Sequence, residues 1–333
     1  MKNIFLYVFI LMPFSLSAQI ICGEVRDAET NVPIINANVY LNGTYTGTMT
    51  DTLGVFKLDC KGRLKHILVV SSVGYYSESI HQYDSLNFIR VSLNPKVIEL
   101  AEVQVVFNKT EMEKLRKKAL KRFQQEFLGN TYNARKCEIE NLDDLLFRVV
   151  EDKKIFEAYT EKPLKIYNGA MGYTITYHLE NFSLNNDTLA YEGYHFFVED
   201  TSRSKWKTKR MIKRREWTYR GSRMHFFRTL FTGEIKEEGF VLRDSLNNIV
   251  EPGPILSEIH ENSRNMISRG SFMLYFFPDM KNIYTFKISS LHIDSDSVHF
   301  TRDGYFDPRV IIWSGEAAKH RVGDLLPFEY KVQ

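Results

Sequence analysis

The 333-residue chain carries 44 Lys and Arg against 41 Asp and Glu, a formal net charge of +3. The net charge is too close to balance for the chain as a whole to bind nucleic acid through its composition alone. Any site for an anionic partner must therefore be local. With 44% hydrophobic and 14% aromatic residues, the chain can bury one or two cores, which excludes an intrinsically disordered protein.

Residues 1–18 have the pattern of a secretory signal peptide. Lys2 precedes an apolar run over residues 4–14, and small residues end the segment at Ala18. The run is shorter than the ~20 apolar residues of a membrane span. A lipoprotein signal would place a cysteine directly after the small residues, whereas Cys22 follows a pair of isoleucines. We therefore expect export, cleavage after Ala18, and no transmembrane span in the mature chain.

Between residues 19 and 106, short apolar segments alternate with turns. Apolar residues recur at period two, as in strands with one buried face: Ile21, Val25, Val39, Leu41, Phe56 and Leu58. Gly, Pro, Asp and Asn occupy the intervening turns. Short strands separated by turns every roughly 8–12 residues predict an all-β sandwich.

The order and spacing of these residues resemble the carboxypeptidase regulatory-like domain, a seven-stranded transthyretin-like sandwich. The matching positions include Gly23, Val25, Asp27, Pro33, Gly43, Thr44, Gly47, Asp51, Gly54 and Phe56, and then segments 66–70, 73–75, 91–93 and 100–105. The resemblance implies no peptidase activity, because in carboxypeptidases this domain is an accessory beside a separate zinc domain. It implies no transport either, because the remaining chain is too short for the barrel of a TonB-dependent receptor.

After residue 106 the pattern becomes helical. Thr110 and Glu113 form a capping box, and apolar residues at helical spacing continue to Phe127 before Gly129. This pattern predicts a connecting amphipathic helix over residues 107–130. The predicted fold class is therefore mainly β, with the seven-stranded transthyretin-like β-sandwich over 19–106 followed by an α+β domain over 131–333.

The C-terminal region mixes both periodicities. Alternation predicts a hairpin of residues 146–150 and 155–159, aromatic strands over 173–179 and 191–198, and further strands over 239–243, 283–293, 298–302 and 310–313. The spacing of Trp217, Gly221, Met224 and Arg228 predicts one helix that stops near Gly233. We also expect a helix over 257–266 and docking of the apolar end, residues 326–330.

Motifs for catalysis, metals or cofactors are missing from the sequence. It contains no GxSxG, HExxH, P-loop or paired CxxC, so we expect no cofactor and no metal. Cys22, Cys60 and Cys137 have no histidine companion and are expected to be free or packed. His292 with Asp294 and Asp296 comes nearest to a metal set, but solvated turn residues are the simpler interpretation.

Residues 203–228 are strongly basic and aromatic. They hold eleven Lys or Arg with Glu216 as the single acid. Arginines beside aromatic rings can hold a phosphate, uronic acid or lipid headgroup, whereas nucleic acid would not fit an exported chain. The candidate anionic-ligand contacts are Trp217, Arg220, His225 and Arg228. The alternative is a solvated helical face whose apolar side packs on the sheet.

Five Asp-Ser/Thr-aliphatic triplets form another pattern. Their hydroxyl residues are Thr52, Ser85, Thr188, Ser245 and Ser297. Some bacteria whose exported proteins resemble this one O-glycosylate that tripeptide, which makes these residues candidate O-glycosylation sites. The alternative is that the triplets initiate turns before strands.

Two classes of function remain open. The first is a non-catalytic cell-envelope module that binds a protein or glycan, and the second is an uncharacterised envelope hydrolase or transferase with its site near Trp217, His225 and Arg228. An enzyme should show a deep pocket with convergent polar groups, and a binding module should show a flat or grooved aromatic surface. The C-terminal region resembles that of exported Gram-negative proteins with no assigned reaction, which implies the periplasm, outer membrane or cell surface.

Overall fold

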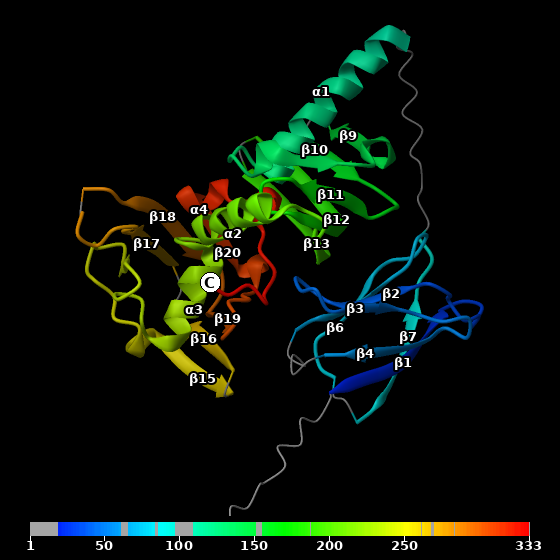
Figure 1. Ribbon diagram of the computed structural model, residues 1–333, viewed down its shortest axis with the longest axis horizontal. Coiled ribbons are helices and arrows are strands. Elements are labelled where there is room, and N and C mark those ends of the chain that lie inside the picture. The colour runs from blue at the N-terminus through cyan, green and yellow to red at the C-terminus, as the bar shows by residue number, and fades with distance from the viewer. Residues whose placement is uncertain are drawn as a thin grey trace, which may run out of the picture.

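The computed structural model describes most of residues 19–333. The described residues are 19–60, 66–83, 86–96, 109–150, 155–186, 188–260, 262–267, 270–282 and 284–332. The expected signal peptide at 1–18 and the candidate site Ser85 lie outside them. Three hydrophobic cores divide the described part into a β-sandwich, a six-stranded sheet under α1, and a set of strands around α3 (Figure 1).

The N-terminal part is the seven-stranded β-sandwich that the sequence predicts. Its strands are β1 (Ile20–Asp27), β2 (Asn38–Leu41), β3 (Gly47–Met49), β4 (Val55–Asp59), β5 (Leu68–Ser71), β6 (Glu78–Ile80) and β7 (Phe88–Leu93). One sheet has the order β4-β1-β7 and the other has the order β3-β2-β5-β6. The period-two residues Ile21, Val25, Phe56 and Leu58 are all buried between the sheets, as strand alternation requires.

The second part is a six-stranded sheet with the order β8-β11-β12-β10-β9, in which β13 also pairs with β12. The elements are α1 (Lys109–Leu128), β8 (Cys137–Ile139), β9 (Leu146–Val150), β10 (Ile155–Tyr159), β11 (Leu164–Asn168), β12 (Tyr173–Asn185) and β13 (Thr188–Glu199). The predicted hairpin is confirmed as the antiparallel pair β9 and β10. Helix α1 packs by its C-terminal half, where Phe123 lies 4.9 Å from the ring of Phe182.

The third part surrounds helix α3 (Arg223–Thr232) with two small sheets. One has the order β14-β17-β18-β20 and the other has the order β15-β16-β19. Their bounds are β14 (Phe240–Arg243), β15 (Leu256–His260), β16 (Ser263–Ile267), β17 (Gly270–Phe276), β18 (Lys287–Ile293), β19 (Ser297–Thr301) and β20 (Ile311–Gly315), with a short α4 (Glu316–Lys319) after them. Phe226, Phe227 and Leu230 of α3 fill the core between these sheets.

The prediction of a helix over 257–266 is wrong, because this segment forms β15 and β16. The two strands pair with each other, and β16 also pairs with β19, so that Met266 lies opposite Val298. Met266 is fully buried in the third core. A partner strand that comes thirty residues later in the chain thus overrides the local preference.

The helix expected to run through Gly221 is also wrong, because the chain breaks there into α2 (Lys205–Tyr219) and α3. Gly221 has φ +78°, and a Cβ atom at this position would lie 2.4 Å from the ring of Phe276. The Ser222 side chain then accepts a hydrogen bond from the His225 amide and caps α3. Gly233 ends α3 in the left-handed conformation, as predicted. Among the described residues, none of the helices combines the length and the apolarity needed to cross a bilayer.

Candidate functional site

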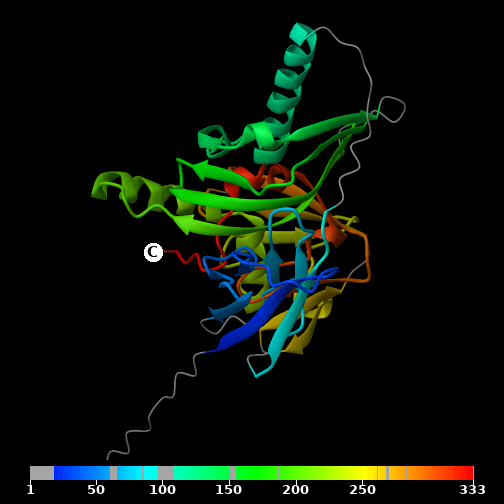
Figure 2. The same cartoon turned by 90° about the vertical axis from the view of Figure 1, so that its right-hand side faces the viewer.

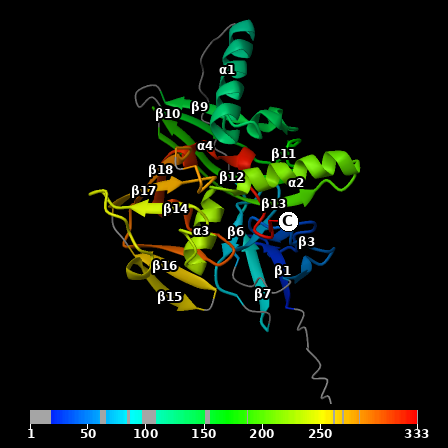
Figure 3. The same ribbon diagram turned by 60° about the vertical axis from the view of Figure 1, so that its left-hand side comes forward.

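Helix α2 buries one face and exposes the opposite one. Its buried residues are Met211, Arg215, Thr218 and Tyr219. At 100° per residue, the opposite side carries Trp206, Arg210, Lys213 and Trp217, which we call the α2 outer face. Trp206 is 63% exposed and Trp217 is 73% exposed. The helix projects beyond the six-stranded sheet (Figures 2 and 3), and both indoles of this face are exposed to solvent.

Buried contacts hold α2 rigidly on the sheet. The Arg215 Nε donates a hydrogen bond of 2.8 Å to the Met171 carbonyl, and its guanidinium lies 4.1 Å from the Tyr173 ring centroid. Its Nη1 pairs with Glu199. Because this arginine is only 7% exposed and is bonded to both Met171 and Glu199, it fixes the orientation of α2 and with it the outer face.

The α2 outer face lies in a cluster of uncompensated positive charge. Four lysines of α2 are exposed and form no ion pair within the described part of the chain: Lys205, Lys207, Lys209 and Lys213. The neighbouring acids are already neutralised, since Glu216 pairs with Arg220 at 3.1 Å and Asp200 pairs with Arg203 at 2.6 Å. The local potential at α2 is therefore positive despite the balanced composition.

Aromatic rings lie among these cations. The Arg210 guanidinium lies 4.8 Å from the ring centroid of Trp206, and that of Arg214 lies 4.3 Å from the ring of Tyr132. Lys136 also lies over Tyr132, at 5.9 Å. The basic and aromatic surface thus extends from α2 onto the turn before β8.

The four predicted ligand contacts do not come together at one site. Trp217 belongs to the α2 outer face, and Arg220 is exposed beyond the end of α2 on Glu216. His225 is only 3% exposed, because it packs under Tyr219 and Phe240. Its Nδ1 accepts the Gly221 N–H, which leaves the proton on Nε2 to face Glu238 at 3.2 Å. Burial lowers the pKa of His225 to about 4.

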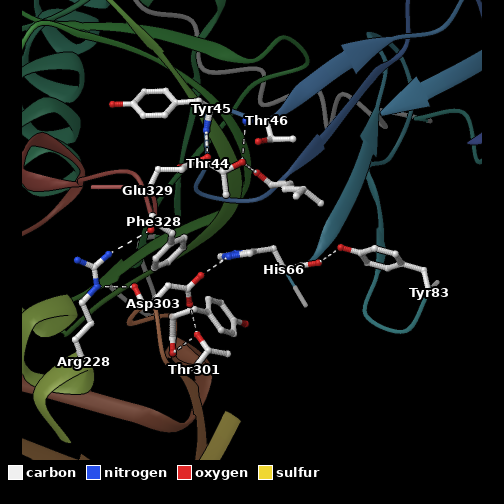
Figure 4. A network of polar contacts seen from close by, with 12 residues as sticks. Thr44, Tyr45, Thr46, His66, Tyr83, Arg228, Thr301, Asp303, Phe328 and Glu329 are labelled. Atoms are coloured by element: carbon white, nitrogen blue, oxygen red, sulfur yellow. Dashed lines mark hydrogen bonds and ion pairs between the residues drawn. The ribbon is translucent and has the colours of Figure 1, made fainter. Parts of the chain in front are cut away.

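Arg228 clamps the C-terminal segment. Its Nε donates to the carbonyl of Asp303 at 2.9 Å, its Nη1 to that of Tyr330 at 2.8 Å, and its Nη2 to that of Phe328 at 3.2 Å. The guanidinium therefore has a structural role in which three backbone acceptors share one cation. Figure 4 shows its bonds to Asp303 and Phe328. The end of the chain docks on the body, as predicted for residues 326–330.

A junction between the β-sandwich and the six-stranded sheet forms at the β2–β3 turn. The Gly43 amide donates to the His195 carbonyl at 2.7 Å, and the Phe197 amide donates to the Thr44 carbonyl at 2.9 Å. The turn therefore extends the sheet beyond β13. The Phe328 amide donates to the Gly43 carbonyl on the other side. Gly43 has φ +72°, and a Cβ atom there would lie 2.4 Å from the Phe328 ring.

Side chains reinforce this junction. His66 forms an ion pair with Asp303, and the Tyr83 hydroxyl donates to the His66 carbonyl (Figure 4). Burial raises the pKa of the Asp303 carboxyl, but the contacts with His66 and Thr301 and the nearby charge of Arg228 together outweigh burial and hold this pKa below its usual value. The Tyr45 amide donates to the Glu329 carboxylate at 3.0 Å. Local sequence patterns do not reveal the junction, because its partners are hundreds of residues apart.

The hollow between the β-sandwich and the six-stranded sheet is small. It is lined by Ser72, Tyr75, Lys96, Glu161, His178 and Glu180, and its volume is about 10 Å³, room for one water molecule at most. Within the described ranges, no group of three or more His, Cys, Asp or Glu side chains could hold a metal ion. His292 is exposed on β18 and bonds Ser271 at 2.9 Å. Cys22, Cys60 and Cys137 are free thiols.

Among the described residues, the triplets at Asp51 and Asp244 lie at turns, whereas Thr188 and Ser297 begin strands β13 and β19. Thr52, Thr188 and Ser245 are exposed, and Ser297 is half-buried at the start of β19. Asp51 accepts hydrogen bonds from the amides of Leu53 and Val55, and Asp244 accepts from those of Leu246 and Asn248. These bonds make the aspartates turn formers, and they leave the neighbouring hydroxyls accessible.

Comparison with known proteins identifies the N-terminal part alone. Residues 21–105 match the CarboxypepD_reg-like domain, so this part of the chain is such a domain and the resemblance seen in the sequence is confirmed. Over 67 residues the chain is 42% identical to the TonB-dependent receptor SusC of Bacteroides thetaiotaomicron, a match that covers 20% of this chain and 6% of the receptor. A solved structure of a 9R-lipoxygenase from Cyanothece is 10% identical over 66% of this chain and 48% of that chain. The TM-score of this match is 0.19, which does not indicate a shared fold.

Proposed function

We propose that this chain is a non-catalytic binding protein of the cell envelope, and that it holds an anionic partner on the α2 outer face. The observation that carries the proposal is the pair of exposed tryptophans, Trp206 and Trp217, on one rigid helix amid unpaired lysines. Exposed tryptophan is costly on a free surface and is enriched where partners bind. The CarboxypepD_reg-like domain would serve as a fixed mount, because the junction hydrogen-bonds it to the sheet that carries α2.

The expected export signal supports the envelope location. The signal pattern at 1–18 lies outside the described residues, but the match to part of a TonB-dependent receptor favours the same compartment. The alternative, a hydrolase or transferase near Trp217, His225 and Arg228, has less support. His225 and Arg228 are engaged in internal bonds, and the hollow beside the six-stranded sheet is too small for a substrate.

Capture from envelope extracts tests the proposal. The mature chain should retain an anionic partner, and the double variant Trp206→Ala/Trp217→Ala should retain at least tenfold less, since two stacked aromatic contacts are removed. Tyr284→Ala is the matched control, because Tyr284 is 89% exposed on a different part of the chain. Equal capture by the wild type and the tryptophan variant would rule out the α2 outer face as the binding site.

The accessible triplet hydroxyls support a second proposal, that this protein is O-glycosylated at Thr52, Thr188 and Ser245, with Ser297 and Ser85 as further candidates. Protein purified from the native host should then have an intact mass above that of the mature polypeptide. The excess should fall by one step when Thr52 is replaced by valine. An unmodified mass would mean that the triplets only form turns.

A further inference from the structure

We propose that the partner of the α2 outer face is the headgroup surface of an anionic lipid bilayer. This inference rests on the proposed function and names the partner of the same site. The first argument is shape. Trp206 and Trp217 are eleven residues apart on one helix, about 16 Å along a straight line. The helix projects outward (Figure 3), and both exposed rings lie on one side of it. A flat surface can therefore contact both rings at once.

The second argument is hydrogen-bonding chemistry. The α2 outer face offers two indoles, the guanidinium of Arg210 and the ammonium of Lys213, all of which donate and none of which accepts. A sugar hydroxyl is both donor and acceptor and is usually met by carboxylates or amides as well. A phosphate diester only accepts, so a donor-only face fits lipid phosphates better than it fits a glycan.

The third argument is the position of the aromatic rings among the cations. Tryptophan prefers the boundary between water and acyl chains, where its ring is buried and its N–H stays hydrogen-bonded. Lys205, Lys209 and Lys213 extend from the same side of the helix, and Arg214 with Lys136 continues the charge around Tyr132. Each such cation near an anionic bilayer strengthens binding by roughly fivefold. Two rings and several cations together give reversible attachment without a membrane-spanning segment.

Co-sedimentation of the full mature chain with vesicles tests the inference. The wild type should bind phosphatidylcholine vesicles that contain phosphatidylglycerol at least tenfold better than pure phosphatidylcholine vesicles, and salt should weaken the binding. Tryptophan emission should shift to shorter wavelength as the indoles leave water. Trp206→Ala/Trp217→Ala should lose at least tenfold in affinity and most of that shift, and Arg210→Gln/Lys213→Gln should lose the preference for phosphatidylglycerol.

Folding of the variants is checked separately, because all four side chains lie on the solvent side of α2. Their thermal unfolding should match that of the wild type, and Tyr284→Ala should bind vesicles as the wild type does. Absence of binding to phosphatidylglycerol vesicles, or binding that survives the tryptophan replacements, overturns the lipid inference. If α2 variants still abolish capture of a polyuronate such as alginate or of an envelope protein, the proposed function stands without it. If the α2 outer face captures nothing, both fail.

Discussion

Replacing Arg228 with methionine should lower the free energy of unfolding by about 3 kcal/mol and the Tm by roughly 5 °C. The side chain donates hydrogen bonds to the carbonyls of Asp303, Phe328 and Tyr330, and methionine would leave all three without this donor. A hydrogen bond to a charged group contributes about 1.5–3 kcal/mol, and part of the loss returns as water enters. Denaturant unfolding of the mature chain measures the change.

The matched control is Arg220→Met. Arg220 is exposed and its guanidinium pairs with Glu216 one helical turn away, so its loss should cost less than about 0.5 kcal/mol. In Arg228→Met, the amides of residues 326–332 should also exchange faster with deuterium, because the segment loses its clamp. An Arg228→Met protein with wild-type stability but lost partner capture would restore Arg228 as a ligand contact.

The β-sandwich was predictable because its evidence is local. Ile21, Val25, Phe56 and Leu58 alternate with polar residues, and strand geometry alone puts all four inside. Gly233 was predictable for the same reason, since a glycine after an apolar helical stretch ends the helix in the left-handed conformation. Where the decisive interaction lies within a few residues, the pattern is sufficient.

The α2 outer face was only partly predictable. The spacing of Trp206 and Trp217 already places both on one helix face, but a helix continued through Gly221 linked Trp217 to Arg228 instead. Gly221 was itself the signal of the break, because glycine tolerates φ +78° where other residues are strained. Which face of a basic helix is buried depends on Met211 and Arg215 packing against the sheet, a fact that periodicity alone does not contain.

The junction was not predictable from the chain. His66 and Asp303 are 237 positions apart, and segment 66–70 of the β-sandwich pattern gives no sign of a partner near Asp303. Gly43 was singled out as a turn residue, yet the ring that requires its missing side chain is that of Phe328 near the other end of the sequence. Such contacts follow from the way the three cores pack, so residues chosen for their chemistry, such as Arg228, turned out to be structural.

Acidification from pH 7 to pH 5 should destabilise the protein steeply, because three histidines are buried in neutral form. Burial lowers the pKa of His178, His195 and His225 to about 4 each, from an ordinary value near 6.5. The unfolded chain therefore binds more protons between pH 6.5 and pH 4. The stability that these neutral histidines contribute is fully present above pH 6.5 and is lost as the pH falls toward 4. At pH 5 the loss should reach about 2 kcal/mol for each histidine.

Two of these histidines make the junction the expected place of acid opening. His178 lies 3.2 Å from the Ser71 hydroxyl of the β-sandwich, and the His195 amide donates to Asn42 at 2.9 Å. In the described structure the buried Nδ1 of His195 has no hydrogen-bond partner, so a proton there would create an unpaired charge. Urea unfolding at several pH values measures the slope, and His178→Gln should remove about one of the protons taken up on unfolding. A flat profile between pH 6.5 and pH 4 would contradict the neutral burial of all three histidines.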